Sequence, residues 1–172
     1  FRPNKADWLE GHWSGLRPAG STDEAEQLEA TSVAPDILKE VGEALCRVPK
    51  EFGVNSKIAR QLEQKRQAID TGEGIDWATG EALAFGSLLL EGHRVRLSGE
   101  DVQRGTFSHR HAVLIDQASQ AEYTPLNNIR TGQAKFEAFN SLLAEFGVLG
   151  FDYGYSLADP KTLVLWEGQF GD

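Results

Sequence analysis

The chain has 172 residues, of which 17 are basic and 26 acidic, so its formal net charge is −9. One sizeable core can be buried at this length, and the negative charge repels nucleic-acid backbones and anionic lipid alike. The longest apolar run, Ala82 to Leu90, is interrupted by Gly86 and is shorter than the roughly 20 residues needed to cross a bilayer. The composition therefore predicts an intracellular globular protein that binds neither nucleic acid nor membrane. Cys46 has no partner for an internal disulfide and is expected to be a small core residue.

The first 35 residues lack sustained periodicity and include the polar stretch PAGSTDEAEQ, which predicts a connecting segment. A first helix is expected from a cap at Asp36 to about Val48, because apolar residues recur there at three- and four-residue spacing. A second helix is expected to begin after Asn55 or Ser56 and to run to about Ile69. Its basic residues predict a solvated outer face: Lys57, Arg60, Lys65 and Arg66.

A third helix is expected after the turn TGEG, because an apolar segment from Trp77 to Leu90 follows a residue that favours helix starts. Asp76 is the expected cap of this helix, since its carboxylate can accept a hydrogen bond from a backbone N–H in the first turn. Gly92 is expected to close it.

The pattern of apolar residues then changes to short segments that are typical of strands: RVRLSGE, HAVLID and TLVLWE. A helix from about Ser141 to Leu157 is expected between the last two. Helices that alternate with short strands predict an α/β fold, in which a largely parallel sheet is flanked by helices. Ligands bind beyond the carboxyl ends of such strands, and Glu100 follows one of these ends.

Glu145 is the most informative single residue of the sequence. Helical spacing gives it mainly apolar neighbours: Ser141, Leu142, Val148 and Leu149. A carboxylate on an apolar face is costly unless it is paired, protonated or used for proton exchange. The alternatives are a capped or ion-paired glutamate, or one exposed at the start of the helix.

Glycines recur on the same segment, at Gly147, Gly150 and Gly154. Glycine lets a backbone approach a neighbour or a flat ligand closely. Packing of the helix against the sheet explains these glycines equally well.

The pattern of Glu145, Gly150 and Gly154 resembles the pyrimidine-binding domain of thiamine diphosphate enzymes such as transketolases and pyruvate dehydrogenases. The surrounding sequence segments are more specific and are similar to the 2-oxoglutarate dehydrogenase family. These segments are DWATGEALAFGSLLLEGHRVRLSGEDVQRGTFSHRHAVL, YTPLNNI, GFDYGYSLADP, LVLWEGQFGD and the opening NKADWLEGHWSGL. The resemblance spans nearly the whole chain. Two conservative departures are Asp152 and Gly168, where Glu and Ala are expected.

The resemblance implies an oxidoreductase of the tricarboxylic acid cycle that uses thiamine diphosphate and magnesium. Its reaction is the oxidative decarboxylation of 2-oxoglutarate, with transfer of the succinyl group to the lipoyl arm of a partner succinyltransferase. The resemblance implies that Glu145 hydrogen-bonds a ring nitrogen of the cofactor's aminopyrimidine and favours its imino tautomer, and that this imine removes the thiazolium proton. The cofactor carries the difficult step, while the protein supplies geometry and proton control.

The resemblance also assigns weaker candidates around Glu145. Glu100, in SGEDV, resembles a glutamate in an acidic proton path between the paired active sites of a homodimer, and a plain loop carboxylate is the alternative. Gly150 and Phe170 are expected to contact the cofactor, although the stacking aromatic ring itself is expected just beyond Asp172. The diphosphate and magnesium ligands are expected outside this chain, because it contains no GDG motif followed by an asparagine.

Four basic side chains receive no firm role. His109 and His111 have a spacing that metal sites use, but no third ligand is signalled, so no metal site is predicted. Arg104 and Arg110 are candidates for contacting an anionic substrate or cofactor, with surface ion pairs as the alternative.

We expect the chain to be a piece of a longer protein, the full-length parent, and to be inactive alone. Residues 1–70 are predicted to form a connecting segment with helices, and residues 71–172 the N-terminal part of a truncated pyrimidine-binding domain. The parent is expected in the cytoplasm of a bacterium, or in the mitochondrial matrix of a eukaryote. Two alternatives remain open: another thiamine diphosphate enzyme of the pyruvate dehydrogenase or transketolase type, and a non-catalytic interaction fragment.

Overall fold

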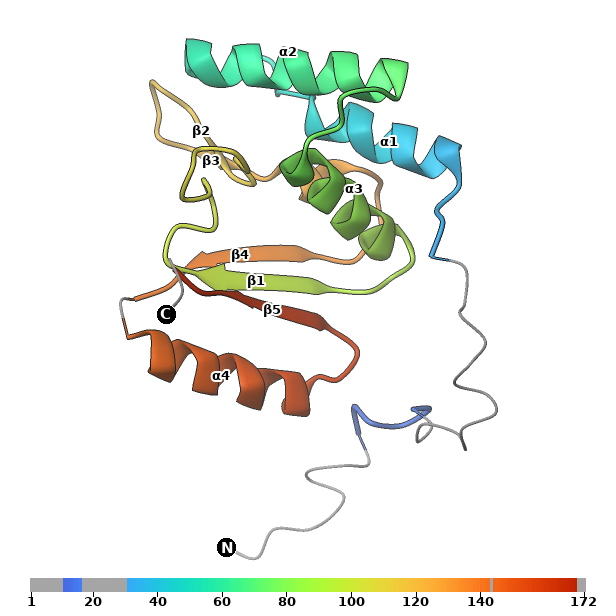
Figure 1. Ribbon diagram of the computed structural model, residues 1–172, viewed down its shortest axis with the longest axis vertical. Coiled ribbons are helices and arrows are strands. Elements are labelled where there is room, and N and C mark those ends of the chain that lie inside the picture. The colour runs from blue at the N-terminus through green and yellow to red at the C-terminus, as the bar shows by residue number, and fades with distance from the viewer. Residues whose placement is uncertain (1–10, 17–30, 143, 170–172) are drawn as a thin grey trace, which may run out of the picture.

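A parallel sheet separates two layers of helices in the computed structural model, which describes residues 11–16, 31–142 and 144–169 (Figure 1). The three strands of this sheet have the order β4-β1-β5, with β1 (Val95–Gly99) between β4 (Phe136–Asn140) and β5 (Leu163–Glu167). On one face, α3 (Trp77–Leu90) packs against the sheet, α1 (Pro35–Leu45) packs on α3, and α2 (Ser56–Thr71) lies outermost against α1. The opposite face carries α4 (Glu145–Ala158). The predicted α/β class is confirmed.

All three strands end at the same edge of the sheet, because both pairings of β1 are parallel and in matching register. Val95 lies opposite Phe136 and Leu163, and Gly99 lies opposite Asn140 and Glu167. We call the edge at which the strands end the carboxyl edge; it is marked by Gly99, Asn140 and Glu167. The chain leaves β4 at this edge and enters α4, so the helix begins there too (Figure 1).

Two strand predictions need correction. The segment HAVLID contributes only β2 (Leu114–Ile115), which pairs antiparallel with β3 (Glu122–Tyr123) outside the main sheet. Asp116 ends β2, since its carboxylate accepts backbone hydrogen bonds from Ser119, Gly53 and Ala118. These bonds lower the pKa of Asp116 to about 2. The third strand of the main sheet, beside β1 and β5, is β4 instead, and it was not predicted.

The helix boundaries agree with the sequence at α2 and α3 but not at α1. The Asn55 side chain accepts from the backbone N of Lys57 at 3.0 Å, and Asp76 accepts from Thr79 at 2.7 Å. Gly92, with φ of 91°, follows α3 as predicted. In α1, the helix starts at Pro35 and ends at Leu45, so Asp36 lies in its first turn rather than at its cap. Proline suits this first position because its φ is already helical.

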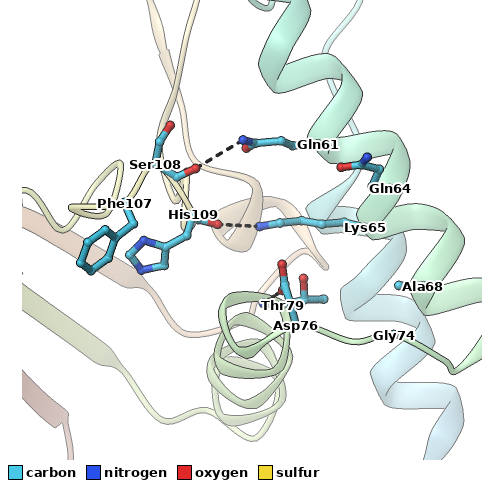
Figure 2. Close-up of a pocket in the computed structure, with 10 residues that line it drawn as sticks. All are labelled: Gln61, Gln64, Lys65, Ala68, Gly74, Asp76, Thr79, Phe107, Ser108 and His109. Atoms are coloured by element: carbon cyan, nitrogen blue, oxygen red, sulfur yellow. Dashed lines mark hydrogen bonds between the residues drawn. The ribbon is translucent and has the colours of Figure 1, made fainter.

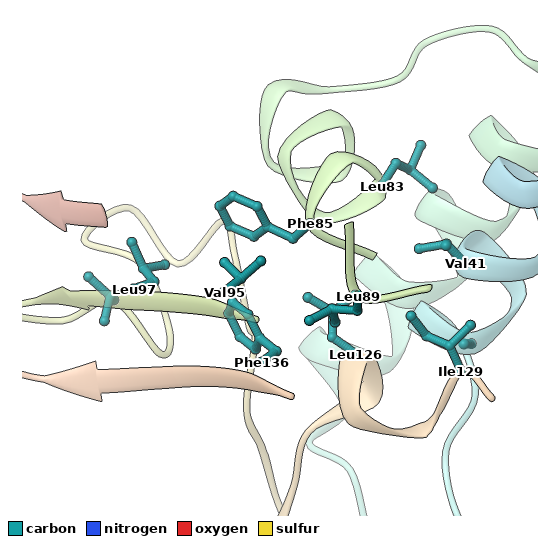
Figure 3. Packing of buried hydrophobic residues seen from close by; sticks show 11 residues of the cluster. Val41, Leu83, Phe85, Leu89, Val95, Leu97, Leu126, Ile129 and Phe136 are labelled. Atoms are coloured by element: carbon teal, nitrogen blue, oxygen red, sulfur yellow. The ribbon is translucent and has the colours of Figure 1, made fainter. Parts of the chain in front are cut away.

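The core fills the space between α1, α3 and the sheet (Figure 3). The Phe85 and Phe136 rings stack with their centroids 5.8 Å apart, which joins α3 to β4. A 3-10 helix, η2 (Pro125–Asn128), adds Leu126 to this core. Cys46 is buried as predicted, and burial raises the pKa of its thiol. Within the described residues, no helix combines the length and apolarity that a bilayer crossing requires.

Arg110 ties the helical layer to the sheet from a buried position, which corrects its predicted alternative of surface pairing. Its Nε donates to Glu81 Oε1 of α3 at 2.7 Å, and its other nitrogens donate to the Glu167 carboxylate and to the Val102 carbonyl. Burial opposes the charge, but the hydrogen bonds to Glu81 and Glu167 outweigh it and raise the pKa of Arg110. Arg104, by contrast, forms the expected surface ion pair, with Asp101.

Replacing Gly86 by alanine should destabilise the chain by about 1–3 kcal/mol, the usual cost of overpacking. A Cβ at Gly86 would clash with Cγ1 of Val41 and would lie 2.9 Å from its Cγ2. Gly80, in the same helix, has no atom within 4 Å of such a Cβ. Gly80→Ala should therefore stabilise the chain by about 0.5–1 kcal/mol through helix propensity. Urea denaturation of both variants checks the pair, and equal effects would contradict the close packing of α1 on α3.

Replacing Arg110 by alanine should lower the free energy of unfolding by at least about 2 kcal/mol, because two carboxylates lose their shared partner. The Arg110 side chain is 5% exposed, against 56% for Arg104. Arg104→Ala is thus the matched control and should cost under about 1 kcal/mol. Thermal and urea unfolding followed by circular dichroism measure both, and a cost for Arg110→Ala no larger than the control would refute the buried tie.

Candidate active site

Polar residues from three elements meet at the carboxyl edge. Glu100 directly follows β1 and is half-buried. Ser141 directly follows β4, and its backbone N donates to the Gly99 carbonyl at 2.7 Å, which holds the two strand ends together. Glu145 is the first residue of α4. The structure thus brings both predicted catalytic glutamates, Glu100 and Glu145, to the same end of the sheet.

The helix that carries Glu145 begins later than predicted. The expected start was near Ser141, whereas α4 begins at Glu145, after Ala144 with φ of −80° and ψ of 71°. Ala144 provides no side-chain cap for the first backbone N–H groups. Glu145 therefore lies in the first turn, where the positive end of the helix dipole favours a negative charge.

Both carboxylate oxygens of Glu145 are buried, and neither accepts a hydrogen bond from any described residue. The alternatives of a capped, ion-paired or exposed glutamate therefore do not describe this side chain. Two other polar groups of the same region are also buried without a described partner, Ser141 Oγ and Trp166 Nε1 of β5. Buried polar atoms without partners are rare and costly, so these three side chains point to a ligand or a further segment that completes their hydrogen bonds.

The surroundings of Glu145 differ from the predicted apolar set. Leu142 lies before the helix and is 82% exposed, and Leu149 is 44% exposed. Of the predicted neighbours, Val148 is half-buried, and the inward face of α4 continues to Asp152, which is buried.

The glycines of α4 do not serve helix-to-sheet packing. A Cβ at Gly150 or Gly154 would have no described atom within 4 Å, and one at Gly147 would only touch the Ala144 Cβ at 3.9 Å. The packing alternative is wrong for these positions. A cofactor contact at Gly150 stays a prediction, and Phe170 lies outside the described residues.

A polar cluster beneath α4 joins this helix to β1. Asp152 Oδ1 accepts from Arg96 Nε at 3.0 Å, and Asp152 Oδ2 accepts from Ser98 Oγ. The Arg96 guanidinium lies over the rings of Phe139 and Tyr155, at 4.4 and 4.9 Å from their centroids. The sequence reasoning missed this cluster, although Asp152 follows Glu145 by seven residues and so falls on the same helical face.

The loop that contains His109, Arg110 and His111, which we call the HRH loop, faces α2 across a cavity of about 410 Å³ that is lined on the loop side by Phe107, Ser108 and His109 (Figure 2). Lys65 was predicted on the solvated face of α2 but instead donates to the carbonyl oxygens of His109 and Arg110, at 3.4 and 3.3 Å. Burial lowers the pKa of the Lys65 ammonium. The ring Nδ1 of His109 is buried without a partner among the described residues.

The imidazole of His111 forms a hydrogen bond within its own loop. His111 Nε2 donates to the Ser108 carbonyl at 2.9 Å, and burial lowers the pKa of its imidazole. The His111 backbone has φ of 48°, which turns the chain so that its N–H reaches the Arg104 carbonyl. Over the described ranges, no three His, Cys, Asp or Glu side chains are grouped as a metal site.

Comparison with known proteins places this geometry in a family. Residues 73–172 match the family described as transketolase, pyrimidine binding domain. Over all 172 residues the chain is 58% identical to proteins named 2-oxoglutarate dehydrogenase E1 component from Brucella ovis, Brucella canis and Brucella melitensis. The chain spans 17% of the length of these relatives. The resemblance to 2-oxoglutarate dehydrogenases is thus confirmed, and the chain belongs to the transketolase pyrimidine-binding domain family.

Proposed function

We propose that the full-length parent decarboxylates 2-oxoglutarate oxidatively and transfers the succinyl group to the lipoyl arm of a partner succinyltransferase. The observation that carries this proposal is the Glu145 carboxylate, buried at the carboxyl edge with no described hydrogen-bond partner. The similarity over the whole chain to 2-oxoglutarate dehydrogenase E1 components supports the choice of substrate and partner. We place the reaction in the tricarboxylic acid cycle, in the bacterial cytoplasm or, for a eukaryotic parent, the mitochondrial matrix.

The unpartnered carboxylate fits thiamine diphosphate. A buried carboxylate oxygen needs an N–H or O–H donor, and a protonated ring nitrogen of the aminopyrimidine is such a donor. When bound, thiamine diphosphate supplies the carbon nucleophile and takes up the electrons that the departing carbon dioxide leaves. Glu145 would hold a proton between its own oxygen and that nitrogen, at the buried end of its side chain.

The remaining site residues have supporting parts in this proposal. We place Glu100 in a carboxylate path between two cofactors of a homodimer, because it follows β1 at the carboxyl edge. Gly150 and Phe170 are proposed cofactor contacts. The ligands of the diphosphate and of magnesium are proposed outside this chain. Residues 1–70 are proposed as a connecting segment and residues 71–172 as part of the pyrimidine-binding domain.

A homodimer is supported by the outer face of α4. Phe146 is 92% exposed, Tyr153 is 66% exposed and Leu149, on the same face at three- and four-residue spacing, is 44% exposed. Large apolar side chains that gather on one helix mark surfaces that other protein segments cover. A second copy of the parent would cover this face and bring the two sites into one particle.

The activity is tested with the purified parent, thiamine diphosphate, magnesium and an artificial electron acceptor. We expect acceptor reduction with 2-oxoglutarate and much less with pyruvate. Preference for pyruvate would favour the pyruvate dehydrogenase type. No reduction with any 2-keto acid would favour a non-catalytic interaction role.

Glu145→Gln in the parent should lower kcat by more than tenfold, a barrier increase above about 1.4 kcal/mol. The amide keeps the shape of the side chain but cannot exchange the proton with the cofactor ring. The folded fraction, from circular dichroism, should not change. Retention of more than a tenth of kcat would remove Glu145 from the mechanism.

Glu100→Gln in the parent should slow cofactor activation or make the two sites more independent, with a smaller loss of kcat than Glu145→Gln. The reason is that Glu100 would relay protons rather than contact the reacting atoms. Pre-steady-state activation kinetics, recorded beside a denaturation curve, measure both properties. A loop glutamate would change stability by about 1 kcal/mol or less. Unchanged activation at both sites would refute the relay.

A further inference from the structure

We propose that Asp152, Arg96 and Ser98 act as a positioning cluster that fixes the register of α4 on β1 and thereby places the Glu145 carboxylate. The inference rests on the proposed function for its catalytic readout only. Its structural part concerns how one helix is held on one face of the sheet.

The cluster supplies the directional contacts between α4 and the sheet. Asp152 is 3% exposed and is the one fully buried residue of α4, all of whose residues the structure describes. Its two oxygens engage different side chains of β1, since Oδ1 accepts from Arg96 and Oδ2 from Ser98. Residues two apart on a strand point to the same face, so both partners reach toward α4. A sliding or rotation of the helix would break both hydrogen bonds.

Aromatic rings from β4 and α4 also contact the Arg96 guanidinium and restrict its position. Its guanidinium lies 4.4 Å from the ring centroid of Phe139 in β4, and 4.9 and 5.4 Å from those of Tyr155 and Phe151 in α4. The Arg96 cation therefore joins its own strand, β1, to both β4 and α4. Apolar packing tolerates small shifts, whereas a charged hydrogen bond between buried groups has a narrow range of geometry. The cluster thus selects one position of α4.

The geometry of the helix transmits that position to Glu145. Asp152 and Glu145 are seven residues apart, which is two turns and about 10 Å along the same face. The first turn of α4 has no side-chain cap of its own. The other charged contact of this helix region, Asp159 with Arg94 at 3.9 Å, lies at the far end of α4 and is partly exposed. Asp152 is consequently the nearest charged anchor of Glu145 among the described residues.

The test compares Asp152→Asn with Asp159→Asn in the full-length parent. Both changes replace an aspartate that pairs with an arginine: Asp152 with Arg96 of β1, and Asp159 with Arg94, just before β1. Only Asp152 belongs to the cluster. With Asp152→Asn we expect kcat for 2-oxoglutarate to fall at least tenfold and KM to change less than twofold. We also expect amide hydrogen exchange at residues 148–151 of the cofactor-free protein, the first amides of α4 with helical hydrogen bonds, to speed up at least tenfold. Asp159→Asn should change none of these quantities more than twofold.

Arg96→Lys is the second variant, for the case in which Asp152→Asn does not fold. It keeps the charge but loses the planar guanidinium, so it should give smaller changes of kcat and exchange in the same directions. Wild-type exchange at residues 148–151 in whichever variant is folded would overturn the proposal, as would a kcat within twofold of wild type in an active parent. If the parent shows no 2-oxoglutarate activity, the proposed function fails, and the exchange measurement alone decides the positioning role.

Discussion

β1 pairs in parallel with two strands that lie much further along the chain, and the placement of every candidate residue depends on this pairing. Because both pairings share one register, Gly99, Asn140 and Glu167 end side by side. The segments that leave these strand ends must then start from one edge. Glu100, Ser141 and the first turn of α4 meet there for that reason. The polar groups of the site thus come from distant parts of the sequence without any direct bond between Glu100 and Glu145.

Two arginines, one buried and one half-buried, connect the layers of this acidic chain. Arg110 joins α3 to the end of β5 through Glu81 and Glu167, and Arg96 joins β1 to α4 through Asp152. Buried ion pairs contribute little net stability, since desolvation offsets much of the attraction, but they penalise any arrangement that separates the partners. An apolar core of leucines and phenylalanines would tolerate small displacements of α4. Arg96 restricts displacements of α4 on one face of the sheet, and Arg110 restricts displacements of α3 on the other.

Local signals predicted the elements that are determined locally. Asn55 and Asp76 cap α2 and α3 as expected, because a capping side chain needs only its own first turn. Alternating residues identified β1, and a short apolar segment identified β5. Strand β4 escaped prediction, since FEAFN is short and gains its strand character from pairing with β1. HAVLID was assigned to the main sheet because its apolar run carries no sign of the turn that the Asp116 carboxylate builds with Gly53, far away in sequence.

In the candidate site, too, the sequence predicted what is determined locally and missed what distant contacts determine. Glu145 was identified from the sequence, but its environment was not, because the start of α4 depends on the chain path out of β4. Lys65 was placed outward from helical periodicity, whereas the carbonyls that attract it belong to the HRH loop. Asp152 drew attention only as a conservative departure from a family pattern. Its significance required knowing that Arg96 and Ser98 lie under α4.

The outer face of α4 has a consequence for handling the chain in solution. Phe146, Leu149 and Tyr153 form an apolar surface that is exposed to solvent whenever no other protein segment covers it. The net charge of −9 keeps separate copies apart, but concentrated salt screens this repulsion to within about 3 Å at 1 M. Salting-out during purification would thus press these aromatic faces together, so low ionic strength is the condition under which the isolated chain is best kept dispersed.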